Sequence, residues 1–472
     1  MLRRKVYDAL MEWKENGDKP LVVYGQRQVG KTFIVDEFAK RNYRTYIYAN
    51  LNEDRAFRSI FEQEDRTIGN ILLSMRVIRG IDHMDPEDTL IFLDEVQDCE
   101  AALGALKTFR EDGRYKVVAS GSMLGVDINP GKRDEEPRPL VPVGQVTEIR
   151  MTSLDFEEFL WANGIPQDAI DGVRSRIAAG KPIGSAVLNE FSKLFRTYQV
   201  VGGMPAAVRR FVEDRTTFAG AFKELDDILS MVKRDITKYS TPENAAKTAE
   251  CFESIPAQLA ETNKRFHYSR IDPLGTKGGS RRAADRYMGN LVWIKQAGYG
   301  NFCYALEQIA SPLTAQIKRD VFRVYLSDTG MLTRMYGDRT AAAVFTSDPG
   351  FNKGAITENV VAECMYKCGF QPCYYLKNNG ENRMEIDFVV EFFGGPVAIE
   401  VKSGKDRSAP SIWKVADHFR VHRRIMLEDG DVWMGEDGIE HYPIFAAAFM
   451  DSLDQRPGFL RAPGVAPMTI GI

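Results

Sequence analysis

The chain has 472 residues, of which 44% are hydrophobic and 27% charged, and its formal net charge at pH 7 is -4. This composition excludes a disordered or collagen-like chain, and the length is enough for about three domains at roughly 150 residues each. No run of about 18 apolar residues occurs, the N-terminal segment lacks the apolar region of a signal peptide, and the 6 cysteines are too few for a disulfide scaffold. We therefore expect a cytoplasmic protein that does not associate with a membrane.

The first 150 residues alternate short apolar runs with amphipathic stretches, which is typical of a parallel sheet covered by helices. Strands are predicted at residues 21–24, 44–48, 90–93 and 116–119. From 154 to 231 the apolar spacing is mostly helical, with a break at the Gly-Gly-Met-Pro of residues 202–205. After residue 350 we predict a helix at 355–368, strands at 385–392 and 397–402, and a helix at 412–419.

A phosphate-binding motif follows the first predicted strand. The sequence Gly25-Gln-Arg-Gln-Val-Gly30-Lys31-Thr32 fits the pattern G-x-x-x-x-G-K-[ST] and lies between an apolar strand and a helix. The glycines allow the backbone to wrap phosphates, and the amides at the helix N-terminus point toward negative charge. We expect Lys31 near the β- and γ-phosphates and Thr32 as a ligand of Mg²⁺. The residues of this loop expected to bind ATP are Gly25, Gln28, Val29, Gly30, Lys31 and Thr32, and Asp94, Ser120 and Ser122 of the following strands complete the set.

Two acids end the apolar run Leu90-Ile-Phe-Leu-Asp94-Glu95. Asp94 can hold the Mg²⁺ shell, and Glu95 can polarise a water for attack on the γ-phosphate. This adjacent acid indicates a hydrolytic ATPase rather than a small-molecule kinase, and we assign catalytic roles to Glu95 and Lys31. Ser120 and Ser122, at the end of the next strand, can sense the γ-phosphate or can simply form a turn.

Acidic residues and a lysine gather in a predicted hairpin nearer the C-terminus, where two β-rich runs flank Gly394-Gly395. A turn centred there pairs residues whose numbers add up to 789, which sets Asp387 opposite Lys402. One face of the sheet then carries Glu385, Asp387, Glu400 and Lys402. Such a set can hold a divalent ion for phosphodiester hydrolysis, with Glu358 or Glu363 of the preceding helix as a further ligand. It can equally form a salt-bridge ladder on a solvated face.

Residues 262–325 carry a local charge of +7, from eleven Lys or Arg against four Asp or Glu. Arg281, Arg282 and Arg286 lie within this stretch, in a pattern that indicates a helix leading toward a short strand. That pattern suits a winged-helix element whose arginines neutralise backbone phosphates. A solvated basic face or a surface that docks a protein is an equally good interpretation.

The order of these motifs resembles that of bacterial and archaeal AAA-type ATPases that carry a C-terminal domain of uncharacterised function. The resemblance covers about residues 1–450 and rests on GQRQVGKT, LIFLDEVQ, VVASGSMLG, VPVGQVTEIRMTSLDFEEFL, VGGMPAAV, FRVYLSDTGML, GAITENVVAECMYKCGF and EIDFVVEFFGGPVAIEVKSG. It implies a C-terminal domain similar to PD-(D/E)XK nucleases. In that nuclease pattern Asp387 matches the metal aspartate, Glu400 and Lys402 the E-x-K pair with a catalytic lysine, and Glu358 the helix acid.

The resemblance also implies the fold, which is α/β with an additional-strand P-loop NTPase core, a helical lid, a winged-helix-like segment and a restriction-endonuclease-like domain. We place the P-loop core at 1–150, the lid at 151–231, the winged-helix-like basic segment at 232–344, the nuclease-like domain at 345–450 and a tail at 451–472.

We expect a Mg²⁺-dependent ATPase whose nucleotide state controls its C-terminal half, with DNA or RNA as the target. The alternatives are an ATP-gated, metal-dependent nuclease and a nucleotide-bound switch that docks a protein partner or a second copy of the chain. Relatives usually carry Gly-Arg where this chain has Gly144-Gln145. Arg27, Arg138 and Arg234 are the candidates to replace that arginine.

Overall fold

The computed structural model describes residues 2–122, 144–238, 242–271, 279–377, 383–404, 410–454 and 456, and the side chains of 279–285 lie outside the description. The described residues form two compact units. The first consists mainly of residues 3–153, and the second of residues 154–295 and the chain from 299 onward. No helix within the described ranges combines the length and the apolar character that crossing a membrane requires.

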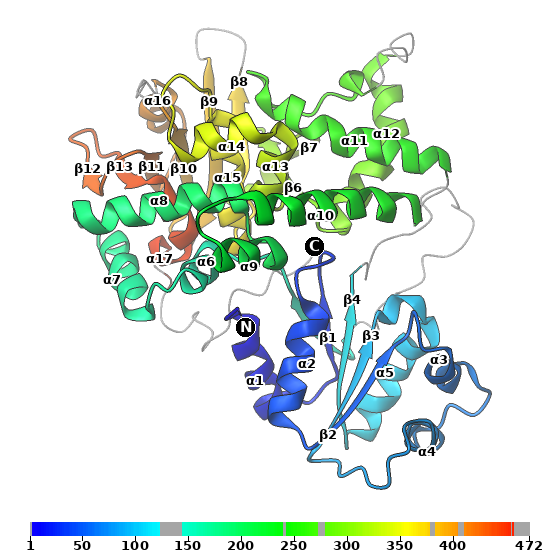
Figure 1. The fold of residues 1–472 in the computed structure, drawn as a ribbon. Helices are drawn as coiled ribbons and strands as arrows, with labels where there is room; N and C mark the ends of the chain where they lie inside the picture. The colour runs from blue at the N-terminus through cyan, green and yellow to red at the C-terminus, as the bar shows by residue number, and fades with distance from the viewer. Residues whose placement is uncertain are drawn as a thin grey trace. The chain divides into compact units, whose positions relative to one another are not determined.

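The first unit is built on a parallel sheet with the strand order β2-β3-β4-β1-β5 (Figure 1). The strands are β1 (Leu21–Tyr24), β2 (Thr45–Asn50), β3 (Thr89–Asp94), β4 (Lys116–Gly121) and β5 (Thr147–Arg150). The four predicted strands are confirmed. The helices of this unit are α1 (Val6–Asn16), α2 (Lys31–Asn42), α3 (Arg55–Glu62), α4 (Ile68–Arg79), the 3₁₀ helix η1 (Val96–Asp98) and α5 (Glu100–Asp112).

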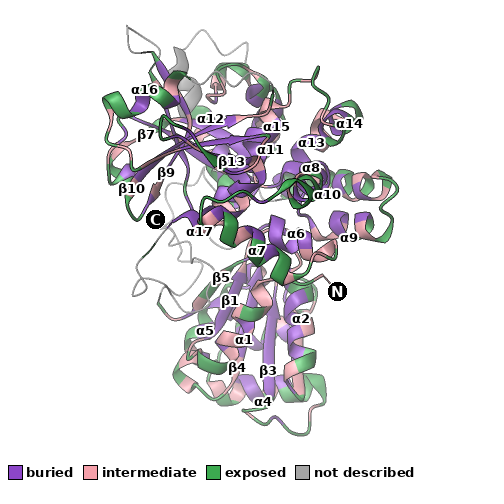
Figure 2. Ribbon diagram, turned by 90° about the vertical axis from the view of Figure 1, so that its left-hand side faces the viewer, coloured by how far each residue is buried: buried purple, intermediate pink, exposed green. Residues whose placement is uncertain are grey.

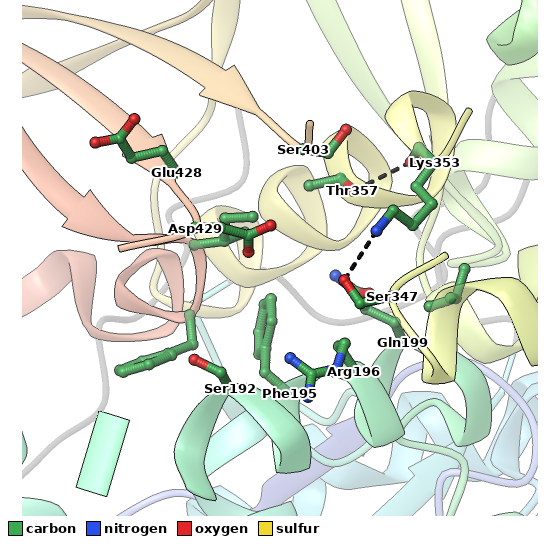
Figure 3. Close-up of a pocket in the computed structure, with 13 residues that line it drawn as sticks. Ser192, Phe195, Arg196, Gln199, Ser347, Lys353, Thr357, Ser403, Glu428 and Asp429 are labelled. Atoms are coloured by element: carbon green, nitrogen blue, oxygen red, sulfur yellow. Dashed lines mark hydrogen bonds between the residues drawn. The ribbon is translucent and has the colours of Figure 1, made fainter. Parts of the chain in front are cut away.

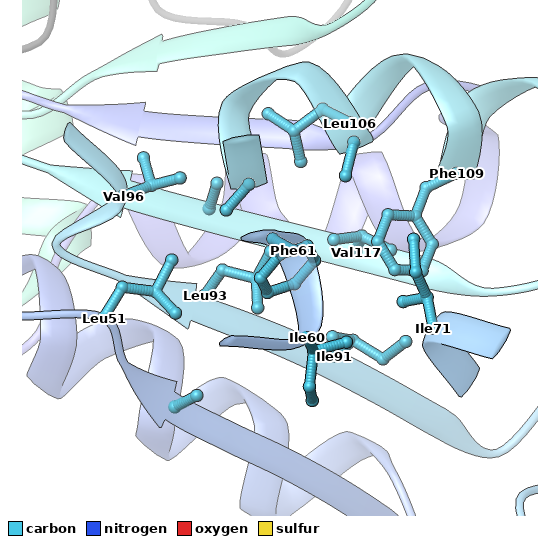
Figure 4. Close-up of a cluster of buried hydrophobic side chains, with 14 of the residues drawn as sticks. Leu51, Ile60, Phe61, Ile71, Ile91, Leu93, Val96, Leu106, Phe109 and Val117 are labelled. Carbon is cyan, nitrogen blue, oxygen red and sulfur yellow. The ribbon is translucent and has the colours of Figure 1, made fainter. Parts of the chain in front are cut away.

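Helices cover both faces of this sheet, which explains why its central strands are almost entirely apolar. The crossover from β1 to β2 runs in the opposite direction to the crossovers from β2 to β3 and from β3 to β4. Because such crossovers are right-handed, α2 lies on one face and α3 to α5 on the other. Figure 4 shows the core beneath α3 to α5, where Leu93 of β3 lies in one buried cluster with Phe61 of α3 and Phe109 of α5.

The second unit begins with the helices that the sequence predicts between 154 and 231. The break at 202–205 is confirmed, because α8 ends at Val201 and α9 starts at Pro205. Gly203 is required there, since a Cβ at this position would lie 2.1 Å from the carbonyl oxygen of Leu154. The helices of this unit are α6 (Phe156–Ala162), α7 (Gln167–Ala178), α8 (Ser185–Val201), α9 (Pro205–Glu213), α10 (Ala219–Lys238), α11 (Pro242–Ala260), η2 (Tyr268–Arg270), α12 (Gly279–Gln296), η4 (Leu313–Gln316), α13 (Thr329–Tyr336), α14 (Asp338–Phe345), α15 (Gly354–Lys367), α16 (Pro410–His418), η5 (Ile444–Phe449) and α17 (Met450–Leu453).

An eight-stranded sheet forms the centre of the second unit, in the order β12-β13-β11-β10-β9-β8-β6-β7. Its strands are β6 (Gly300–Leu306), β7 (Ile317–Leu326), β8 (Cys373–Lys377), β9 (Met384–Phe392), β10 (Gly395–Lys402), β11 (Arg423–Glu428), β12 (Trp433–Met434) and β13 (Glu440–Pro443). Colouring by burial shows β10 and β13 largely buried within this unit (Figure 2). The predicted helices and strands after residue 350 therefore all form, and the two strands are neighbours in this sheet.

The segment predicted as winged-helix-like, residues 232–344, does not form a body of its own. Its strands β6 and β7 pair with each other, and β6 also pairs in parallel with β8 at Tyr304 and Ala305. This pairing extends the C-terminal sheet by two strands. The boundary expected at 344–345 is therefore bridged by sheet hydrogen bonds.

The hairpin β9-β10 has a different register from the one expected. The turn lies at Phe393-Gly394, so Gly395 pairs with Phe392 and the numbers of opposed residues add up to 787 instead of 789. Continued by one pair, this register sets Asp387 opposite Glu400. The turn is displaced because Gly395 opens β10 at φ 123°, and because a Cβ on Gly394 would lie 2.4 Å from the His422 ring. A shift by two keeps the alternation of faces, so the four polar side chains still share one side.

Candidate functional site

The loop between β1 and α2 has the backbone that phosphate binding requires. Gly25 and Gly30 adopt φ angles of 147° and 91°, which favour glycine. At Gly25 a Cβ would lie 2.0 Å from the carbonyl oxygen of Met151, so no larger residue fits this conformation. Gly30 immediately precedes α2, and the first amides of that helix are directed toward the loop. The loop is therefore shaped as a cradle for an anion.

Lys31 is already held in this loop. It is only 7% exposed, and its ammonium donates to the carbonyl oxygens of Gly25 at 2.9 Å and Gln26 at 2.8 Å. These contacts fold the side chain back over the glycine loop instead of leaving it in solvent. A cation is thus fixed where the predicted β- and γ-phosphates would bind.

Asp94 is the centre of a hydrogen-bond network at the end of β3. It is 3% exposed and accepts from the Thr32 hydroxyl at 2.9 Å, from the Tyr48 hydroxyl at 3.2 Å and from the Ser120 hydroxyl. Burial, with the Asp94 charge as the next cause, raises the pKa of Tyr48 to about 12, so this phenol stays a donor. The structure brings the predicted residues Thr32, Asp94 and Ser120 together, and it adds Tyr48 to them.

Glu95 adopts a left-handed backbone with φ 52°, which is uncommon for a residue with a side chain. Its carboxylate accepts from the side-chain amide of Gln97 and lies 3.4 Å from the Ser122 hydroxyl. The Arg27 guanidinium in turn donates to Ser122 at 3.2 Å. Glu95 is thus held by neighbours that include the predicted Ser122, whereas sequence reasoning missed Gln97. The sequence signal that could have identified Gln97 was its position two residues after Glu95.

Gln145, the departure from the Gly-Arg of relatives, accepts a hydrogen bond from the Arg110 guanidinium. An arginine at 145 would place two guanidinium groups together, so glutamine is the better partner for Arg110 at this position. Among the candidate replacements, Arg27 lies beside Ser122 in the first unit and Arg234 is exposed on α10 of the second. Arg138 lies outside the described residues.

Comparison with known proteins places this site in a class. Residues 17–160 match the family described as an AAA domain, while residues 192–342 and 353–444 match two domains of unknown function, DUF8612 and DUF4143. The chain therefore carries an AAA-type domain with a P-loop NTPase core, and this match supports nucleotide binding. No match was found among curated proteins.

Solved structures show loose similarity to the chain. A Walker-type ATPase of Pyrococcus abyssi has 15% identity and a TM-score of 0.38, with 71% of this chain and 96% of that chain covered. DnaA from Aquifex aeolicus, with AMPPCP bound, has 17% identity and a TM-score of 0.23, with coverages of 62% and 93%. PCH-2 of C. elegans has 11% identity and a TM-score of 0.20, with coverages of 62% and 65%. At these TM-scores the similarity carries no argument about function.

A second polar cluster lies in the second unit, around β9, β10 and α15. It contains the predicted carboxylates Glu358, Asp387 and Glu400, whose charges act on one another. Asp387 accepts from the backbone amide of Val401 at 3.0 Å, and the Lys402 ammonium lies 2.9 Å from Glu400. Glu358 and Glu400 are buried and Asp387 is partly buried, so the solvated ladder that the sequence left open does not describe these three acids.

Burial strongly affects protonation in this cluster. It raises the pKa of Asp387 well above its usual range, and the charges of Glu358 and Glu400 add to this effect. Burial likewise raises the pKa of Glu400, although the hydrogen bond and charge of Lys402 oppose the shift. Buried acids that also repel each other ionise only where positive charge lies nearby.

Two cations that the sequence did not single out supply that charge. Lys264 donates to Glu358, and the buried Arg323 donates to Glu385 at 2.6 Å. The described part of the chain contains no group of three or more His, Cys, Asp or Glu side chains arranged to hold a metal ion. The predicted ligand set of Glu358, Asp387 and Glu400 is therefore brought together, but as part of an ion-pair cluster.

The predicted nucleic-acid residues fall on α12. The side chains of Arg281 and Arg282 lie outside the described residues, and Arg286 is exposed. Two other cations of the same basic stretch, Lys264 and Arg323, point inward to acids. Part of the local charge of +7 is therefore internal and unavailable to an external partner.

A pocket elsewhere in the second unit is lined by Arg196, Lys353, Glu428 and Asp429 among others (Figure 3). Its lysine is engaged, because the Lys353 ammonium donates to the Ser347 hydroxyl at 3.0 Å. The cavity volume is only about 40 Å³, room for a few water molecules and too little for a nucleotide. It is not a second nucleotide site.

Proposed function

We propose that the first unit binds ATP with Mg²⁺ and hydrolyses it. The observation that carries this proposal is the contact between Thr32 and Asp94, 2.9 Å apart, with Glu95 next in the chain and the P-loop lysine on the same loop. These residues fit the cofactor, since a hydroxyl and a carboxylate are ligands that Mg²⁺ accepts. When bound, the ion would neutralise phosphate charge.

The residues of this unit divide the work of hydrolysis. The glycine loop and Lys31 hold and orient the phosphates, while Thr32 and Asp94 hold the ion. Glu95 polarises the attacking water and accepts its proton, a task that needs a carboxylate in a fixed orientation. The amide of Gln97 and the hydroxyl of Ser122 supply that orientation. Ser120 and Ser122 lie close enough to these acids to respond to the γ-phosphate.

Glu95→Gln is expected to lower ATP turnover by ~100-fold or more while nucleotide affinity stays unchanged, because the amide keeps the shape but cannot accept a proton. Steady-state phosphate release and binding of a fluorescent ATP analogue measure the two quantities. Glu111→Gln is the matched control, since Glu111 is 64% exposed on α5 and forms an i,i+4 salt bridge with the exposed Lys107. Equal turnover in wild type and Glu95→Gln would remove Glu95 from the catalytic residues.

We also propose that nucleotide state in the first unit controls the second unit, and that a nucleic acid is its target. Support comes from the basic stretch 262–325 and from the exposed Arg286 on α12. A protein partner or a second copy of the chain would use the same exposed face, and both are outcomes of the test. Metal-dependent strand cleavage has less support, because Glu358 is paired with Lys264 and the predicted catalytic Lys402 with Glu400.

Added DNA or RNA is expected to change ATP turnover, and the triple replacement of Arg281, Arg282 and Arg286 by alanine should weaken that effect. Binding measured against salt concentration should lose about one unit of slope per phosphate contact removed. Replacement of Arg209 and Arg215, which are exposed elsewhere in the second unit, is the control. Binding that the triple variant leaves intact would assign these arginines to a solvated face or a protein-docking surface.

A further inference from the structure

In the polar cluster of the second unit, acidic side chains are paired with basic side chains of the same unit. Its acids are Glu358, Glu385, Asp387 and Glu400, and its cations are Lys264, Arg323 and Lys402. Six of these seven side chains pair directly: Lys264 with Glu358, Arg323 with Glu385, and Lys402 with Glu400. Asp387 is the seventh, and it accepts a hydrogen bond from the backbone amide of Val401.

Lys264 reaches the acids from a segment outside the β9-β10 hairpin. Its ammonium donates to Glu358, its charge acts on Asp387, and its side chain is 17% exposed. A single ammonium therefore serves two of the three carboxylates that were predicted to bind a metal. It does so from the stretch between α11 and η2, far from β9 and β10 in the sequence.

The chain around Lys264 is fixed, so this ammonium is part of the fold. The amide of Phe266 donates to the carbonyl oxygen of Phe322 at 2.8 Å, and their rings stack with centroids 6.0 Å apart. The amide of His267 donates to the side chain of Gln258 at 2.6 Å. These contacts anchor the segment to β7 through Phe266 and to α11 through His267. They thereby hold Lys264 beside the acids.

Two buried polar atoms of the cluster, Glu400 Oε2 and Arg323 Nη1, have unused hydrogen-bonding capacity. The Oε2 atom of Glu400, a residue 8% exposed, has no hydrogen-bond partner among the described residues. The Nη1 atom of the fully buried Arg323 is likewise without one, and it lies 4.0 Å from Glu358. A carboxylate oxygen left unsatisfied beside two further acids is a ready ligand for a cation.

We propose that the ammonium of Lys264 stands in place of a divalent cation, so that Glu358, Asp387 and Glu400 are held together without a metal and become a divalent-ion site only when that ammonium is removed. A divalent ion placed beside Lys264 would meet a like charge at close range, which opposes binding. Without Lys264, the repulsion among the three carboxylates, one of which has an open oxygen, would no longer be relieved, and Mg²⁺ or Mn²⁺ would draw them together.

The test is a titration of the full chain with Mn²⁺ in the absence of nucleotide. Calorimetry and electron paramagnetic resonance measure how many Mn²⁺ ions bind per chain. Lys264→Met is expected to bind one more Mn²⁺ per chain than wild type, and Mn²⁺ should raise its unfolding temperature. Any Mn²⁺ ion bound at Asp94 is present in both proteins, so it does not affect the difference in the number of ions bound between Lys264→Met and wild type. The double variant Lys264→Met with Glu400→Gln should lose the additional site.

Lys318→Met is the matched control, because Lys318 belongs to the same basic stretch, is 39% exposed and lies 3.8 Å from Glu307. It should gain no Mn²⁺ site. A folded Lys264→Met chain that gains none would overturn the proposal. The wild-type protein provides a test that does not depend on whether Lys264→Met folds. Its unfolding temperature should not rise through binding of Mn²⁺ to this cluster. A Mn²⁺-induced rise that Glu400→Gln abolishes would also overturn the proposal.

Discussion

Lys31→Ala is expected to lower affinity for ATP by ~100-fold or more, equivalent to about 2.7 kcal/mol. The change removes the ammonium that donates to the carbonyl oxygens of Gly25 and Gln26 within the P-loop, where Lys31 is 7% exposed. Hydrogen bonds from a charged donor to phosphate contribute about 1.5–3 kcal/mol each, and this ammonium can make more than one. Calorimetric titration with a non-hydrolysable ATP analogue measures the loss directly.

Lys40→Ala separates this effect from a general change in charge or in helix α2. Lys40 lies on the same helix, is 61% exposed and pairs with Asp36 at 2.6 Å. Its replacement should leave nucleotide affinity unchanged. If Lys31→Ala folds and binds the analogue as wild type does, the loop is not a phosphate site, and the proposed ATPase activity fails with it.

The P-loop could be predicted from sequence because its determinants are contiguous. Gly25, Gly30, Lys31 and Thr32 lie within eight residues, and the strand before and the helix after them are specified by their own apolar patterns. Asp94 required one further step, since the carboxyl ends of neighbouring parallel strands meet at one edge. Tyr48 contacts Asp94 but belongs to no motif, and Gln97 ends the motif LIFLDEVQ without a role that the motif assigns, so their contacts are shown only by the structure.

The cation cluster could not be predicted, because its partners are distant in sequence. Lys264 and Glu358 are 94 residues apart, and Arg323 and Glu385 are 62 apart. A local count of basic residues indicates an external partner, yet these two cations face inward once β6 and β7 join the C-terminal sheet. The hairpin shows the same limit on a smaller scale: the alternation of faces was right, while the register depended on a turn that the His422 ring constrains.

Glu363 has a different role from the metal ligand considered for it. It is 0% exposed, and one of its oxygens accepts from the Tyr198 hydroxyl at 2.7 Å and from the Lys367 ammonium at 2.6 Å. The other accepts from the amide of Thr329 at 2.7 Å and from its hydroxyl at 2.5 Å. Its carboxylate thereby ties α8, α13 and α15 together inside the second unit, which makes it a structural residue.

Glu363→Gln is therefore expected to destabilise the second unit by about 3–5 kcal/mol, because the buried charge of Lys367 loses its partner. The side-chain amide of the new glutamine also points its NH₂ group at either Thr329 or the Lys367 ammonium. Both of these groups donate to Glu363 in the wild type, so two donors would then face each other. Chemical denaturation followed by the fluorescence of the buried Trp293 measures the change in this unit. Glu243→Gln, at a salt bridge whose acid is 81% exposed, should leave the unfolding midpoint nearly unchanged.

The pair Glu363→Gln with Lys367→Met distinguishes an orphaned charge from simple loss of hydrogen bonds. Removing both charges avoids the cost of a buried, unpaired ammonium, so the double variant should recover much of the stability that Glu363→Gln loses. Lys367 is 6% exposed and also donates to the carbonyl oxygen of Leu154 at 2.8 Å, so the recovery should be incomplete. Additive losses in the double variant would mean that the charge pair contributes nothing, and that the hydrogen bonds of Glu363 to Tyr198 and Thr329 account for its whole effect.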